Sequence, residues 1–279
     1  MPPARALACT ATLLATIGGC RGGASGPKVT LRYHPPAGAA YHYALDQQNA
    51  MRFEGGPMGA VPEQTFRMRM YYTQLVKGPA PGGVAVTVTF DSTSLDAPGM
   101  GAGAMRPALD RMHVLSAAFT GLTGAASPVT EQLGSSLKAM AFPLPEGPVG
   151  VGDSWVAEHE LPLGRQALNA SRPLKSRTRI TVKEIQIAGA DTSVVLGIET
   201  HFPDEPITLT QQGEGGAPQT GTLRLSGSLS GEQVYSLQRS AQVRAMMGGT
   251  IKMKSGSAGQ PETTMAMTQQ TSLQLTQDK

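Results

Sequence analysis

Apolar and polar residues alternate with a period of two in many parts of the sequence, and this pattern constrains the fold more than any other feature. The clearest examples lie in residues 66–72, 84–90 and 180–187, and others begin near 223, 251 and 273. Successive side chains of a strand point to opposite faces, so the alternation predicts strands with one buried face. Threonine is common between the apolar positions, which suits a pleated surface that is wet on one side.

Clusters of Gly, Pro, Asp and Ser separate the alternating segments, at 54–62, 77–83, 96–103, 203–206, 213–218 and 255–261. Such clusters mark turns, and their spacing predicts about 11 to 13 strands joined by hairpins. We therefore expect a mainly β fold, an antiparallel sheet that forms a half-open barrel or a sandwich. Two segments, 104–118 and 131–141, are expected to form short helices, although Pro107 and Gly134 weaken both. Because the strand pattern continues throughout, residues 28–279 are expected to form a single β-rich domain.

The first twenty residues have the organisation of a secretion signal. Arg5 precedes an uncharged, mostly apolar run from Ala6 to Ile17, which is followed by Gly18, Gly19 and Cys20. The apolar run is shorter than the about 20 residues that a membrane-spanning helix needs. Ile17-Gly18-Gly19-Cys20 resembles the lipobox of bacterial lipoproteins, and this resemblance implies residues 1–19 as a signal peptide cleaved between Gly19 and Cys20.

The same resemblance implies that Cys20 carries the lipid. In that family the cysteine sulfur is lipidated and the new amino terminus is acylated, commonly with palmitate, and several acyl chains together make a stable anchor. Residues 20–27 then form a lipidated tether. Arg21 follows the cysteine, and by resemblance to lipoproteins of bacteria with two membranes the absence of Asp there favours sorting to the outer membrane. We therefore expect a location in the cell envelope, on the periplasmic face of the outer membrane.

Charge and cysteine content exclude several classes of partner and site. The chain has 23 Lys and Arg against 20 Asp and Glu, which argues against a nucleic-acid-binding protein. It has two cysteines, Cys9 and Cys20, and Cys9 would leave with the signal peptide. A disulfide framework and a four-cysteine zinc site are therefore excluded.

One segment in mid-chain resembles a known family. Residues 148–155, with the sequence PVGVGDSW, resemble the P-V-x-V-G-D-S-W segment of a family of bacterial lipoproteins that is described only as a domain of unknown function. The resemblance implies a secreted, mostly antiparallel β protein and carries no activity. From the residues themselves, Gly152 and Asp153 are expected to form a turn that the Asp153 side chain caps, with Trp155 filling the core beside it.

Few residues of the sequence match a catalytic or metal-binding pattern, and no match is complete. Ser154 within Gly-Asp-Ser could suggest a lipase nucleophile, but the motif lies mid-chain and no histidine follows His201. Ser135 and Lys138 match S-x-x-K, yet the asparagine-containing element of penicillin-binding proteins is missing. The five histidines form no metal-ligand spacing. We expect no enzyme activity, no metal and no cofactor.

The 14 methionines are the one compositional oddity. Pairs two residues apart, such as Met68 and Met70, lie on one face of a strand. The functional interpretation is a deformable apolar groove lined by Met68, Met70, Met246 and Met253. The structural alternative is that methionine fills the core of a protein that has few aromatic residues, and Cu(I) binding by thioethers is a further alternative.

The sequence therefore predicts a lipid-anchored envelope lipoprotein of non-enzymatic type. The expected function is the binding or carriage of a lipid or another apolar ligand in a groove. The alternative is a structural or interaction module that binds an envelope protein or a polysaccharide. Cys20 would link either kind of protein to the membrane.

Overall fold

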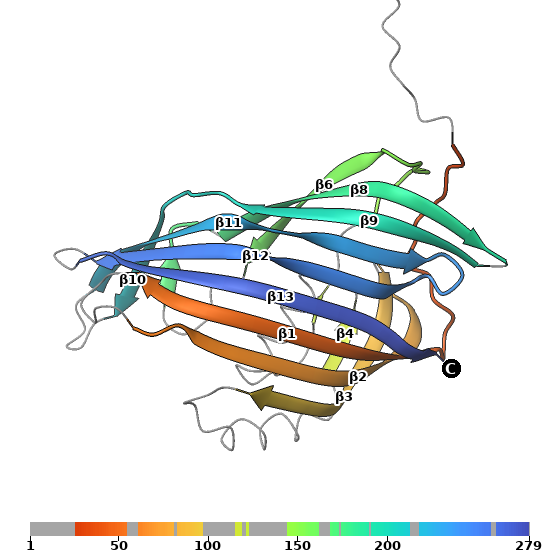
Figure 1. Cartoon of the computed structure of the whole chain (residues 1–279), viewed down its shortest axis with the longest axis horizontal. Helices are drawn as coiled ribbons and strands as arrows, with labels where there is room; N and C mark the ends of the chain where they lie inside the picture. The colour runs from red at the N-terminus through yellow and green to blue at the C-terminus, as the bar shows by residue number, and fades with distance from the viewer. Residues whose placement is uncertain are drawn as a thin grey trace, which may run out of the picture.

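The protein, seen in a computed structural model, is built around one large antiparallel sheet (Figure 1). The structure describes residues 26–54, 61–80, 83–96, 115–118, 121–122, 144–161, 168–172, 174–189, 191–212, 218–257 and 261–278. Thirteen strands occur in these residues: β1 (Ala40–Glu54), β2 (Gln64–Ala80), β3 (Gly83–Asp96), β4 (Leu115–Ala118), β5 (Gly121–Leu122), β6 (Ser154–Leu161), β7 (Leu168–Ala170), β8 (Leu174–Ala188), β9 (Asp191–Phe202), β10 (Ile207–Gln212), β11 (Pro218–Ser236), β12 (Ala241–Ser257) and β13 (Thr263–Asp278).

The strand order is β5-β4-β3-β2-β1-β13-β12-β11-β9-β8-β6, and β10 and β7 continue from β11 off this path. Most neighbours in the sheet are also neighbours in sequence, as the expected hairpins require, but β1 pairs with β13 and so joins the two ends of the chain. The expected mainly β, antiparallel fold is confirmed. It is a single open sheet, because the end strands β5 and β6 do not pair with each other in the described part of the chain.

One face of the sheet, here called the inner face, carries most of the buried hydrophobic side chains. In β1 burial alternates from Tyr41 through Tyr43 to Leu45, and the residues between them are more exposed. The same alternation runs through β8, from Leu174 to Val182. Apolar residues therefore alternate with polar ones in these strands because the apolar side chains are buried on the inner face, while the side chains between them face water.

Two clusters of buried residues fill this inner face. The first joins β1, β2, β3, β12 and β13 through residues such as Leu45, Met70 and Leu273. The second joins β6, β8, β9 and β11 to the segment before β1, from which Leu31 is fully buried. In that second cluster the ring of Tyr33 meets the edge of Tyr235 at a centroid distance of 5.7 Å.

The expected helices are not found where they can be checked. Residues 104–114 and 131–141 lie outside the described residues, whereas Leu115–Ala118, the end of the first expected helix, forms β4 and pairs with β3. Pairing with a long neighbouring strand overrides the local helix preference at these four residues. In the part of the chain that the structure describes, no helix is long and apolar enough to cross a membrane.

Candidate functional site

The register of the central strands arranges the inner face in rows that run across the sheet. Two rows near the end of β1 are almost wholly apolar: Phe53–Met265–Met253–Leu225, and Met51–Met267–Ile251–Gly227. Residues directly opposite in adjacent strands have Cβ atoms about 5 Å apart, so these side chains form one continuous patch. We call it the methionine surface, and it consists of Met51, Phe53, Leu225, Ile251, Met253, Met265 and Met267.

The methionine surface is half-buried and does not belong to either packed cluster. Ile251 is buried, and the other six residues keep intermediate exposure. Methionine is unbranched and polarizable, so a surface that is rich in it adapts its shape to different apolar ligands. These residues lie outside both hydrophobic clusters, and the first cluster ends at Leu45 on β1 and at Leu273 on β13.

A polar cluster separates the methionine surface from the first packed cluster. It consists of Gln47 and Asn49 on β1, opposite Thr271 and Gln269 on β13. Gln47 Nε2 donates to Asn49 Oδ1 at 3.3 Å, and Gln269 Nε2 donates to Thr271 Oγ1 at 3.0 Å. Asn49 is only 2% exposed, and its Nδ2 is buried without a hydrogen-bond partner. A buried donor without a partner costs about 1–3 kcal/mol, so this atom needs an explanation.

Charged side chains lie on the opposite, outer face in this region. In the five rows from Phe53 to Leu45, every inner-face residue of β2, β1, β13, β12 and β11 is uncharged. The outer face carries Lys252 and Lys254 and the pair of Arg67 and Asp46, whose Nε and Oδ1 atoms are 2.8 Å apart. A hydrogen bond from Arg67 lowers the pKa of Asp46, which keeps that carboxylate charged at the outer surface. The inner face thus offers a neutral site.

Two glycines on the inner face, one in β11 and one in β12, leave no room for a side chain beside the paired strand. A Cβ at Gly231 would lie 1.9 Å from the backbone oxygen of Met246, and one at Gly249 would lie 2.1 Å from the backbone oxygen of Ser228. Glycine in a strand interior marks a close backbone approach or a bend of the sheet. These positions contribute no side chain to the inner face beside the polar cluster.

The four methionines that the sequence assigned to a groove do not share one. Met253 belongs to the methionine surface, whereas Met68, opposite Gln47, is partly buried and packs against the first cluster. Met70 is 1% exposed and packs in the first cluster, so this methionine fills the core, as the structural alternative predicts. The assignment of Met246 is wrong: it points to the outer face and is 62% exposed, because its place in β12 differs by an odd number of residues from that of Met253.

Residues 150–153 form a tight turn ahead of β6. The Asp153 carboxylate accepts a hydrogen bond from the Gly150 backbone N–H at 2.8 Å, and Gly152 adopts φ +92°, which favours glycine. Trp155 packs against the second cluster, and Ser154 is exposed opposite Thr181. The geometry is that of a structural turn, which is how the sequence alone described these residues.

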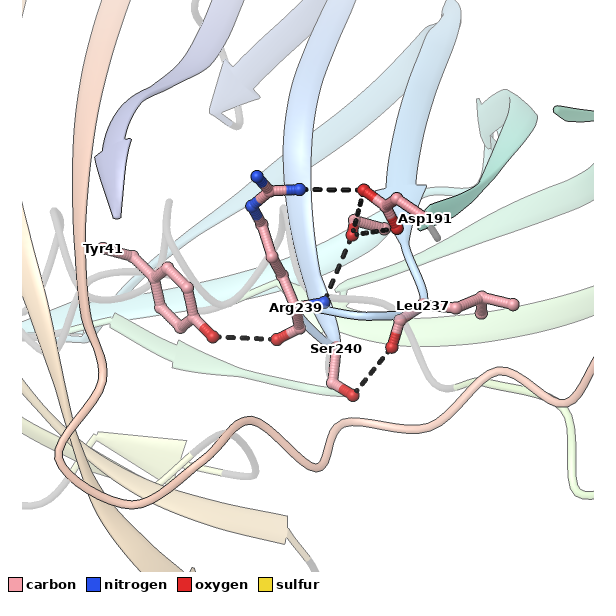
Figure 2. A network of polar contacts seen from close by, with 6 residues as sticks. Tyr41, Asp191, Leu237, Arg239 and Ser240 are labelled. Carbon is pink, nitrogen blue, oxygen red and sulfur yellow. Dashed lines mark hydrogen bonds and ion pairs between the residues drawn. The ribbon is translucent and has the colours of Figure 1, made fainter. Parts of the chain in front are cut away.

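A second polar site lies at the β11–β12 turn (Figure 2). Arg239 Nη1 donates to Asp191 Oδ2 at 2.8 Å, Ser236 Oγ donates to the same carboxylate at 3.0 Å, and the Tyr41 hydroxyl donates to the Arg239 carbonyl at 2.8 Å. A pocket of about 260 Å³ opens beside Asp191 and Arg239. The two charges neutralise each other, and the serine that holds the carboxylate is fully buried. The network links the turn to β1 and β9. Because Asp191 and Arg239 pair with each other, neither charge is available to a charged ligand.

Other candidates from the sequence lie outside the described residues or find no support. Cys20, Gly19, Ser135 and Lys138 are outside the described residues. Within the described ranges, no group of three or more His, Cys, Asp and Glu side chains could hold a metal ion. In the segment Glu158-His159-Glu160 of β6, the two glutamates are exposed and the histidine is half-buried on the other face, because side chains alternate along a strand.

Comparison with known proteins adds no assignment. Neither the models of protein families nor the curated proteins match this chain. The lipoprotein resemblance of residues 148–155 and of the lipobox therefore stays a prediction.

Sequence reasoning missed the residues that complete the site. The spacing of two between Met265 and Met267 indicates that both lie on one face of a strand. Met51 and Phe53 join them only through the pairing of β1 with β13, which the sequence does not reveal. Asn49 was missed because an asparagine within a strand pattern gives no sign of burial. Only its position opposite Gln269, next to the apolar row of Met51 and Met267, makes it distinctive.

Proposed function

We propose that this protein is a non-enzymatic binding or carrier protein for an acylated, uncharged lipid, held in the cell envelope through a lipidated Cys20. The observation that carries the proposal is the methionine surface, an apolar patch on the inner face of an open sheet, outside both packed clusters. Each CH₂ of an acyl chain buried on this surface would contribute about 0.8 kcal/mol. Adaptable methionine side chains would accept chains of different length.

The position of the site on β1 suits a tethered carrier. The amino-terminal segment packs on the second cluster through Leu31 and then leads into the start of β1, whereas Phe53 lies near the other end of that strand (Figure 1). Twelve residues of strand span about 40 Å. A lipid on Cys20 would therefore hold one end of the sheet near the membrane and leave the methionine surface at the other end, accessible to ligand.

The carrier function is tested by polar substitution of the surface with a matched control. In the double variant Met253→Gln and Met265→Gln, two thioethers that face each other across β12 and β13 become amides, and we expect the affinity for 1-monooleoylglycerol to fall at least about tenfold. Met246→Gln makes the same change in β12 on the outer face and should bind like the unchanged protein. Native mass spectrometry of the mature chain, titrated with the lipid, measures both.

Two outcomes would contradict the proposal. One is a mature chain that binds no 1-monooleoylglycerol at any concentration below the lipid's own aggregation. The other is equal loss of binding in the Met246→Gln and the Met253→Gln/Met265→Gln proteins. An empty chain that retains an envelope protein or a polysaccharide through purification would favour the interaction module instead.

The anchor has a separate test. Cys20→Ser removes the sulfur that the lipobox resemblance assigns to the lipid, so the variant is expected to leave the membrane fraction almost completely. Cell fractionation followed by immunoblotting measures the distribution, with Ser25→Ala in the same tether as control. Membrane retention of Cys20→Ser equal to that of the control would refute the lipid anchor.

A further inference from the structure

We infer that Asn49 is the head-group determinant of the methionine surface: its Nδ2 donates a hydrogen bond to the carbonyl oxygen of an uncharged ester or amide on the bound acyl ligand. This inference rests on the proposed function and names the chemistry of the ligand at the same site.

The first argument is the unused hydrogen-bonding capacity of Asn49. Gln47 Nε2 donates a hydrogen bond to Asn49 Oδ1 at 3.3 Å, so the other atom of the amide group, Nδ2, is directed away from Gln47. That nitrogen is buried and has no partner. A ligand that supplies the missing acceptor would recover this desolvation penalty through the new hydrogen bond.

The second argument is the position of Asn49 in the rows of the inner face. Met51 of the methionine surface follows it on the same face of β1, and Gln269 and Phe66 lie opposite it on β13 and β2. A chain lying across Met51, Met267 and Phe53 would therefore end with its first carbons beside the Asn49 amide. A carbonyl at the head of the chain would reach Nδ2 while the chain covers the thioethers.

The third argument is the charge of the surroundings. The inner-face rows around Asn49 hold no Lys or Arg on β2, β1, β13, β12 or β11, so a buried carboxylate or phosphate would lack a counter-charge. A neutral carbonyl needs only one donor. The site is thus matched to a glyceride, an ester or an acyl amide, and mismatched to a free fatty acid.

Access to Nδ2 requires rearrangement of the side chains around it, since the atom is enclosed in the structure. The neighbours along and diagonally across the strands include Met51, Met68 and Met267, whose three side-chain torsions allow them to move aside. Ligand entry then exchanges contacts between thioethers for contacts between thioethers and the acyl chain.

The test compares two ligands that differ only in the carbonyl: 1-monooleoylglycerol and its ether analogue, 1-O-oleylglycerol. We expect the unchanged mature chain to bind the ester about five- to tenfold more tightly than the ether, the factor that one added hydrogen bond supplies. In Asn49→Leu, whose side chain has similar size and no donor, the two ligands should bind equally. Oleate at pH 8 should bind the unchanged protein more weakly than the ester.

Gln270→Leu is the matched control, because Gln270 lies on β13 next to Gln269 but on the outer face, where it is exposed. This variant should keep the preference for the ester. Equal binding of ester and ether by the unchanged chain would overturn the inference and leave the carrier function standing. A preference for the ester that survives in Asn49→Leu would also overturn it. Failure to bind either lipid would instead count against the proposed function itself.

Discussion

Gly231→Ala is expected to destabilise the protein by about 3 kcal/mol or more, or to prevent folding. A Cβ at this position would lie 1.9 Å from the Met246 oxygen, 2.8 Å from the Met246 carbonyl carbon and 2.7 Å from the Met247 Cα. All three atoms are backbone of β12, so no side-chain rotation relieves the clash. Relief requires β11 and β12 to separate at the centre of the sheet, where their pairing extends from Gly221 to Ser236 on β11.

The control is Gly147→Ala, where an added Cβ meets no atom within 4 Å. Urea unfolding followed by circular dichroism measures both variants against the unchanged protein. Gly147→Ala should stay within about 0.5 kcal/mol of it, as is usual for surface changes. If both variants unfold at the same urea concentration, the close approach of β11 and β12 is not what requires glycine at 231.

Alkaline pH is expected to destabilise the fold strongly through buried tyrosines. Burial raises the pKa of Tyr72 and Tyr235, and burial together with neighbouring tyrosines raises the pKa of Tyr43. The fold keeps the neutral phenol, whereas the unfolded chain ionises above a pKa of about 10. The stabilising contribution is therefore complete below pH 10 and is lost as the pH rises above it. At pH 11 the three groups together should cost about 4 kcal/mol.

Urea midpoints between pH 8 and pH 11, with tyrosinate absorbance at 295 nm recorded in parallel, test this expectation. Tyr72→Phe keeps a ring to stack on Tyr43, 5.2 Å away between centroids, and removes one ionisable group. Its loss of stability between pH 8 and pH 11 should be smaller by about 1.4 kcal/mol. A loss identical to that of the unchanged protein would show that Tyr72 ionises in the folded state.

Much of the fold was predictable because strand patterns are local. Val84, Val86 and Val88 alternate in sequence and are all buried on one face of β3. The Asp153 turn was predictable for a similar reason, since an aspartate three residues from Gly150 can reach its backbone N–H. Leu115–Ala118 was mispredicted as the end of a helix, because four residues carry too little pattern to outweigh pairing with β3.

The candidate site was predictable only in part. Met253 could be assigned to an apolar face from its own strand, but Met246 was placed on the same face although an odd spacing separates the two. The pairing of β1 with β13 joins residues more than two hundred positions apart, and alternation says nothing about such a register. Asn49 and Gln269 became opposite neighbours through that pairing alone.

The sequence by itself determined that the chain forms amphipathic strands with turns between them, because side-chain direction alternates within each strand regardless of its neighbours. It also determined that the strands hold few charges on their apolar faces. Only the tertiary structure decided which strands adjoin and in which register. Since a shift of one residue exchanges the faces of a strand, that register alone set the methionines beside Asn49, whose Nδ2 has no hydrogen-bond partner.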